Sequence, residues 1–211
     1  MNISQLTSVQ KDVLREIGNI GAGNAATSMS KLLDKKIDMQ VPSVNIVSYD
    51  EMMDLIGGPE ELIVAVFFRI QGEAPGSVYL ILSIEEAELL INQITGDQMI
   101  SLISEEGPDE LAVSVIQEAG NILTGSYLSA LSDFTSINMQ PSVPLLSMDM
   151  AGAILTAGLL EISQVTDFAI VIDTKISHTD SKRGIQGNFF LLPDPESFPK
   201  IFLALGVTDN E

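Results

Sequence analysis

The chain of 211 residues carries 10 basic and 29 acidic side chains, so its formal net charge is −19 when the single histidine is neutral. That balance argues against nucleic acid and anionic membrane surfaces as partners, because both are bound through clustered Lys and Arg. Hydrophobic residues make up 45% of the sequence and cysteine is absent. This composition predicts a sizeable core and excludes disulfides, thiolate nucleophiles and Cys-ligated metals.

The first half of the chain predicts a long helix followed by strands and two shorter helices. Apolar residues spaced three or four apart predict a helix over residues 6–33, capped by Ser4 or Thr7. Its expected buried stripe comprises Leu6, Val9, Val13, Ile17 and Ile20. The remaining elements are expected as strands at 37–48, 62–70 and 77–82, and as helices at 50–56 and 83–95. Pro42 marks an edge or a bulge within the first of these strands.

The same order of elements recurs after a polar, loop-like segment at residues 96–109. Helical spacing returns at 110–131, and a strand at 137–143 follows and ends at Pro144. The last elements are expected as a short helix at 148–156, strands at 159–162, 168–176 and 185–192, and a closing helix at 198–205.

The termini and the single histidine indicate neither membrane targeting nor metal binding. Residues 1–5 lack the basic and apolar segments of a signal peptide, and the longest nearly apolar stretch, 151–160, is too short to span a bilayer. We therefore expect a cytoplasmic protein. His178 begins a polar run, 178–184, that predicts a turn, and we expect this histidine to be a surface residue.

An internal repeat relates the two halves of the chain. An offset of 102 residues aligns residues 12–24 with residues 114–126, and six of these thirteen positions are identical. A shared offset over two helical patterns is hard to obtain by chance. We therefore interpret residues 1–211 as one domain made of two repeats, about 1–104 and 105–211, related by a pseudo-twofold axis.

The repeated residues combine a polar helix face with two glycines. Asp12, Glu16 and Asn19 are spaced i, i+4 and i+7, so they lie on one face beside the apolar stripe and are expected to face solvent or a partner. Gly18 and Gly23 recur in the second copy, although each costs about 1 kcal/mol relative to alanine within a helix. Either something approaches the backbone closely at these glycines, or they serve helix–helix packing inside the fold.

Glutamate and asparagine on an exposed helix favour phosphoryl chemistry over two alternatives. The glycine-rich segment 18–23 follows no predicted strand and precedes no Lys-Ser/Thr pair, unlike a phosphate-binding loop. A glycosidase-type pair of Glu16 and Glu118 would leave the repeated asparagines unexplained. An asparagine amide can hold a water in line with a phosphoryl group, while a carboxylate pairs with a partner's lysine. Because cations are scarce here, a phosphorylated protein substrate would supply the Mg²⁺ and the lysine.

The motif Asp/Ser-x3-Glu-x2-Asn-x22-Pro occurs twice, as Asp12, Glu16, Asn19 and Pro42, and as Ser114, Glu118, Asn121 and Pro144. This doubled motif resembles the signature of the CheC-type response-regulator phosphatases of bacterial chemotaxis, and the resemblance runs over essentially the whole chain. The chain resembles the CheC type itself more than CheX, which has one such motif, or FliY, which has additional domains. The resemblance implies an α/β (α+β) fold in which a pseudo-twofold, mostly antiparallel sheet carries two long motif helices.

The resemblance also implies hydrolysis of the aspartyl phosphate of the response regulator CheY. Two asparagines would orient the attacking water and two glutamates would pair with the regulator's lysine; these catalytic residues are Asn19, Asn121, Glu16 and Glu118. The residues that would support docking, helix geometry or the adjoining strand are Asp12, Ser114, Pro42 and Pro144. We expect no metal site and no cofactor of the chain's own, because Mg²⁺ would be carried by the phosphorylated regulator.

A second partner is implied in the same way. Members of the family bind CheD, a receptor deamidase that enhances the phosphatase activity. Asp149, which lies among small and flexible apolar residues at 147–151, is the candidate docking residue. The alternative function is a non-catalytic adaptor that binds and sequesters CheD or phospho-CheY and uses the motif faces for docking alone.

Overall fold

The structure, a computed structural model, describes residues 7–34, 36–41, 43–105, 107–162, 168–178 and 184–206. The helices in these ranges are α1 (Ser8–Leu33), α2 (Tyr49–Leu55), α3 (Ile84–Thr95), α4 (Glu110–Thr135), α5 (Ala151–Ile162) and α6 (Ser197–Ala204). The strands are β1 (Ile37–Gln40), β2 (Val44–Ser48), β3 (Leu62–Gly72), β4 (Gly76–Ser83), β5 (Met139–Pro141), β6 (Leu145–Met150), β7 (Phe168–His178) and β8 (Ile185–Pro193).

The strands of the described ranges form one sheet in which every pairing is antiparallel. Their order is β1-β7-β8-β4-β3-β5, while β2 also pairs with β7 and β6 also pairs with β3. Each edge therefore consists of two short strands along one long neighbour, and β4 and β8 pair at the centre. This symmetric order confirms the expected antiparallel, duplicated architecture, whereas the repeat boundary at residues 104 and 105 stays a prediction.

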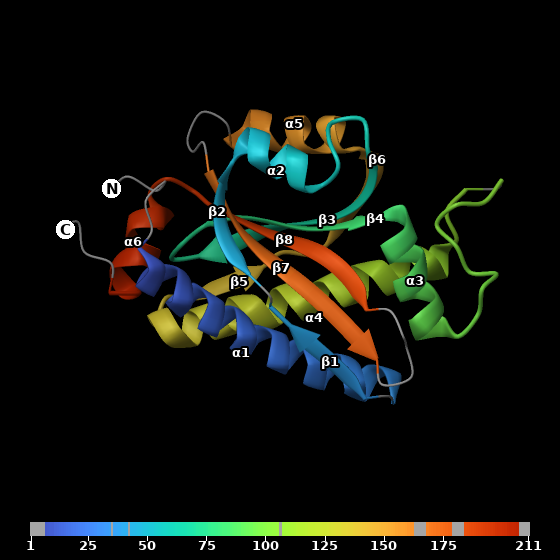
Figure 1. The fold of residues 1–211 in the computed structure, drawn as a ribbon, viewed down its shortest axis with the longest axis horizontal. Coiled ribbons are helices and arrows are strands. Elements are labelled where there is room, and N and C mark those ends of the chain that lie inside the picture. Colours follow the sequence, from blue (N-terminus) through green and yellow to red (C-terminus); the bar gives the residue numbers. More distant parts are fainter. Residues whose placement is uncertain are drawn as a thin grey trace.

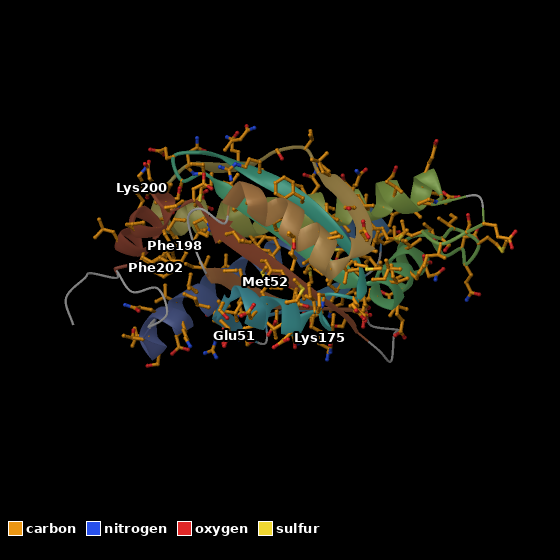
Figure 2. All side chains as sticks on the ribbon, turned by 90° about the horizontal axis from the view of Figure 1, so that it is seen from above. Glu51, Met52, Lys175, Phe198, Lys200 and Phe202 are labelled. Carbon is orange, nitrogen blue, oxygen red and sulfur yellow. The ribbon has the colours of Figure 1, made fainter. Side chains whose placement is uncertain are left out.

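Helices cover both faces of the sheet (Figure 1). The long helices α1 and α4 lie side by side on one face, over a large core that includes Leu14 and Leu123. The short helices α2 and α5 lie on the opposite face, over a smaller core that includes Met52 (Figure 2). At the end of the molecule, Phe198 and Phe202 of α6 stack with ring centroids 4.8 Å apart. The two motif helices are thus held on a single face of the sheet.

The ends of α1 follow from local sequence signals. The Thr7 hydroxyl accepts the N–H of Gln10 at 3.4 Å, and the Gln10 side chain accepts the N–H of Thr7 at 2.8 Å. Asp34 adopts the left-handed conformation after the last turn, and its N–H donates to the carbonyl of Ser30. These contacts satisfy backbone groups that a helix leaves unpaired at its ends. They confirm the long helix expected over residues 6–33 for the part of it that the structure describes.

Two segments of the second half differ from the sequence prediction. Residues 148–150, expected to open a short helix, instead extend β6 and pair with residues 62–64 of β3. Residues 159–162, expected to form a strand, continue α5. The helix begins at Ala151, whose N–H donates to the carbonyl of Glu61 at 2.8 Å. Both predictions were wrong because a short apolar run does not distinguish a strand from a helix until its neighbours are known.

Two further boundaries are also shifted. His178 still belongs to β7 and pairs with Ile37, so it ends a strand instead of opening the predicted turn. Its side chain and residues 179–183 lie outside the described part of the chain, and its expected surface position stays a prediction. The single strand expected over residues 37–48 is divided into β1 and β2.

The buried stripe of α1 differs from the expected one. Val9 and Ile20 are 69% and 46% exposed, while Ile17 is buried as expected. The buried positions of this helix are Leu14, Ile17, Gly18, Gly21, Ala22, Ala25, Ala26 and Met29. Small residues are needed because α4 lies close, and a Cβ at Gly21 would be 2.5 Å from Cδ1 of Tyr127. A stripe built largely of glycine and alanine gives a weak hydrophobic period, so the pattern was misassigned.

Tyr127 joins α4 to the sheet, and titration of its buried phenol should lower the stability of the protein at alkaline pH. Its hydroxyl shares a hydrogen bond of 2.9 Å with Thr174 of β7. Burial raises the pKa of Tyr127 from 10.0 to about 12, although the bond to Thr174 opposes the rise. The stability from this group is therefore complete below pH 10 and is lost as pH rises through 12, by roughly 3 kcal/mol in total.

Urea unfolding at stepwise pH measures this decline. The free energy of unfolding should fall more steeply between pH 10 and 12 in the wild-type protein than in Tyr127→Phe, which has no phenol to titrate. The variant should be about 1 kcal/mol less stable at pH 7 because it lacks the bond to Thr174. Equal slopes for the two proteins would contradict the assignment.

Candidate active site

The first motif forms one exposed face of α1. Asp12, Glu16 and Asn19 are all exposed, as their spacing predicts. The Asp12 carboxylate lies 3.0 Å from the guanidinium of Arg15, its neighbour on the next turn of the helix. Glu16 and Asn19 are three residues apart, so the face presents a carboxylate and an amide one turn from each other.

The second motif forms the equivalent face of α4. Ser114, Glu118 and Asn121 are all exposed. The Ser114 hydroxyl donates to the backbone carbonyl of Glu110 at 2.9 Å, a bond within the same helix. Asp12 and Ser114 therefore both contact their own helices, while the Glu–Asn pair of each helix remains open to a partner.

The motif prolines belong to the edges of the sheet. Pro144 is half-buried and directly precedes β6. Pro42 lies outside the described residues, although Gln40 ends β1 and Val44 begins β2 on either side of it. In both repeats the edge is thus divided into two strands by a three-residue segment that contains the motif proline.

The two faces differ in charge. Lys11 and Arg15 flank the first motif and are exposed, whereas the positions 102 residues later are Val113 and Gln117. Residues 110–121 contain no lysine or arginine. An acidic partner therefore meets weaker electrostatic repulsion at the α1 face than at the α4 face.

The repeated glycines are of two kinds. A Cβ at Gly18 would lie 3.4 Å from a valine methyl of the core, and one at Gly120 would lie 3.1 Å from another. At Gly23 and Gly125, no atom beyond the adjoining residues and backbone of the same helix lies within 4 Å of the Cβ position. Tight packing therefore accounts for Gly120, while a Cβ at Gly18 would make ordinary contact; both face the sheet and not another helix, so the helix–helix packing expected from the sequence is wrong for this pair and the second pair is left unexplained.

Part of the α1 face was missed by sequence reasoning. Ile20, which was assigned to the buried stripe, is 46% exposed and directly follows Asn19. Gly23 is also exposed. Both positions are among the six identities of the repeat. That identity had already indicated Gly23, whereas the apolar character of Ile20 obscured the same signal there.

Asp149 lies on the edge strand β6 and not on either motif helix. It pairs with Ile63 of β3, and its carboxylate accepts the N–H of Met150 at 2.7 Å. Its side chain is exposed, and Leu145 and Met150 of the same strand are 61% and 54% exposed. The strand therefore presents one carboxylate among exposed apolar side chains.

The acidic residues show no metal-binding arrangement in the described ranges. No group of three or more His, Asp or Glu side chains there is placed to hold a metal ion. Glu85 and Glu86 instead occupy the first turn of α3, where the helix dipole favours carboxylates. Among the helices described, none has the length and apolar character needed to cross a membrane.

Both motif segments match a known protein family. The pattern of the CheC-like family matches residues 9–46 and 111–148. The starts and the ends of these two segments differ by the same number, 111 − 9 = 102 and 148 − 46 = 102, which is the offset of the sequence repeat. All eight motif positions fall inside the matched segments.

Similarity to individual proteins extends over nearly the whole chain. The chain is 43% identical over 199 residues to the CheY-P phosphatase CheC of Bacillus subtilis (strain 168), covering 94% of this chain and 95% of that protein. It is 28% identical over 142 residues to the flagellar motor switch phosphatase FliY of the same organism, covering 67% of this chain and 36% of that protein. Its fold is similar to the crystal structure of Thermotoga maritima FliY, with a TM-score of 0.71 at 22% identity, covering 96% of this chain and 99% of that one. On the strength of the near full-length sequence similarity, the chain belongs to the CheC-like family.

Proposed function

We propose that this protein is a hydrolase that removes the aspartyl phosphate of the response regulator CheY. The observation that carries the proposal is the exposed Glu–Asn pair at equivalent positions of two helices, in a chain 43% identical to the CheY-P phosphatase CheC. The α1 pair is Glu16 and Asn19, and the α4 pair is Glu118 and Asn121. The proposal therefore assigns the protein two reaction sites, one on each motif helix.

Each face contributes two groups to the reaction. The amide of Asn19 or Asn121 donates to and accepts from one water and holds it in line with the phosphorus–oxygen bond that breaks. Glu16 or Glu118 pairs with the regulator's lysine and so fixes the docked orientation. The water attacks phosphorus, the aspartate carboxylate leaves, and inorganic phosphate departs. Mg²⁺ belongs to the phosphorylated regulator, the substrate, and this chain contributes position and hydrogen bonds.

Decay of the acyl phosphate tests this function directly. Phosphorylated CheY should lose phosphate faster when the protein is added, in proportion to its concentration and with many turnovers per molecule. The adaptor alternative predicts binding of phosphorylated CheY with an unchanged rate of phosphate loss. That second outcome would contradict the proposed hydrolase.

We also propose that CheD binds at Asp149 and modulates the phosphatase, with all three proteins meeting in the cytoplasm. The support is the exposed carboxylate on β6, flanked by exposed Leu145 and Met150. Asp149→Lys should weaken CheD binding at least about tenfold, because a paired charge is reversed at the contact.

The matched control is Asp38→Lys on β1, the equivalent edge on the other side of the sheet, where the side chain is also exposed. This control should bind CheD as the wild-type protein does in a titration of both variants. Unaltered CheD affinity in Asp149→Lys would exclude the residue from the docking surface.

A further inference from the structure

Two glycines in the middle of the motif helices have no packing role inside the fold. Apart from the adjoining residues and backbone of its own helix, neither Gly23 nor Gly125 has an atom within 4 Å of its Cβ position, whereas a Cβ at Gly21 would lie 2.5 Å from Tyr127. The Thr27 hydroxyl donates to the carbonyl of Gly23 at 2.9 Å, but every residue offers such a carbonyl. Alanine would favour the helix at both positions, so glycine in both repeats needs another reason.

The two glycines lie beside the reacting residues of the proposed function. Gly23 follows Glu16 by seven residues and Asn19 by four, which places it within about 40° of both around the helix. Helical side chains lean toward the N-terminus and cover the preceding turn. A side chain at position 23 would therefore cover Asn19, and the same spacing relates Gly125 to Asn121.

We infer that Gly23 and Gly125 are positioning residues that let the phosphorylated regulator approach Asn19 and Asn121 at backbone distance. The inference rests on the proposed function and names the contact that its substrate makes with each helix. The asparagine amide must come within about 3 Å of the water that it orients. A methyl group or anything larger at the glycine would separate the regulator from the helix and move the amide out of that range.

The contact surface extends from Gly23 toward the N-terminus of α1. Ile20 is 46% exposed and lies about 60° from Gly23 around the helix, which supplies apolar area next to the polar Glu16 and Asn19. The helix therefore offers an exposed glycine one turn after an amide and an apolar side chain, with a carboxylate one turn before the amide. A folded protein that inserts a phosphate toward Asn19 matches this shape.

Each helix is tested with the other one inactivated. In the first background, Asn121→Ala leaves only the α1 face active, and Gly23→Ala or Gly23→Leu is added. In the second background, Asn19→Ala leaves only the α4 face active, and Gly125→Ala or Gly125→Leu is added. We expect kcat/KM for phosphorylated CheY to fall at least about tenfold with alanine and further with leucine. The melting temperature should rise by about 2–4 °C with alanine, because helix propensity improves and nothing is displaced.

The control is Ser28→Ala, at an exposed position of α1 that lies about 120° around the helix from Glu16. It should raise the melting temperature, because alanine has the higher helix propensity, without changing kcat/KM. Opposite movements of stability and activity at the glycines distinguish a positioning role from a structural one, which would lower both together.

Two results would overturn the inference. One is an unchanged kcat/KM in the alanine and leucine variants, and the other is a lowered melting temperature that accounts for the lost activity. If the wild-type protein itself does not accelerate phosphate loss, the proposed hydrolase fails instead. Binding of phosphorylated CheY to the same glycine variants then decides the inference, and unchanged affinity overturns it.

Discussion

Replacing Asn19 and Asn121 together with alanine should reduce the turnover of phosphorylated CheY at least about a hundredfold, because the attacking water loses its orienting group at both sites. Both side chains are exposed, so the double variant should retain the wild-type free energy of unfolding within about 0.5 kcal/mol. The measurement is the rate of phosphate release at several protein concentrations, with a urea unfolding curve for each variant. Turnover at the wild-type rate in the double variant would remove the asparagines from the mechanism.

The two single variants locate the activity. Each should leave one face working, and Asn121→Ala should retain the face that has Lys11 and Arg15 nearby. Asn138→Ala is a matched control, since this asparagine is also exposed but lies in the loop after α4, outside both faces. It should turn over phosphorylated CheY at the wild-type rate.

Phe189→Ala should destabilise the protein by about 3–5 kcal/mol, which is a large share of the total stability of an ordinary domain. Phe189 is 1% exposed on the central strand β8, and its ring centroid lies 4.7 Å from that of Tyr127 on α4. With Leu14 and Ile17 it lines a small apolar cavity between the sheet and both motif helices. Removing the ring enlarges that cavity, so packing contacts to α1 and α4 are lost together.

Urea unfolding measures this loss, and phosphate release should fall with the folded fraction at both faces at once. The control is Leu203→Ala on α6, where the side chain is 65% exposed and truncation should change stability by no more than about 0.5 kcal/mol. A loss below about 1 kcal/mol in Phe189→Ala would show that the core relaxes around the missing ring.

Local signals predicted the elements that position the site. The Thr7 cap and the left-handed Asp34 define the length of α1, and the spacing of Asp12, Glu16 and Asn19 placed them on one exposed face. These predictions succeeded because capping and helical period depend on residues within one or two turns of each other. The segment 159–162 was misassigned because its apolar run suits either a strand or a buried helix.

The sequence by itself determined the repeat, the polar residues of each helix and the family to which their spacing points, because all of these depend on residue identity and offset. Only the tertiary structure decided which side of α1 is buried. Tyr127 of α4 packs against Gly21 and leaves no room for a side chain there. Ile20 and Gly23 remain outside the core. Gly21 and Gly23 look alike in sequence, but one is buried against Tyr127 and the other is exposed. Residues about a hundred positions away decide this difference, because burial depends on which parts of the folded chain pack against each surface.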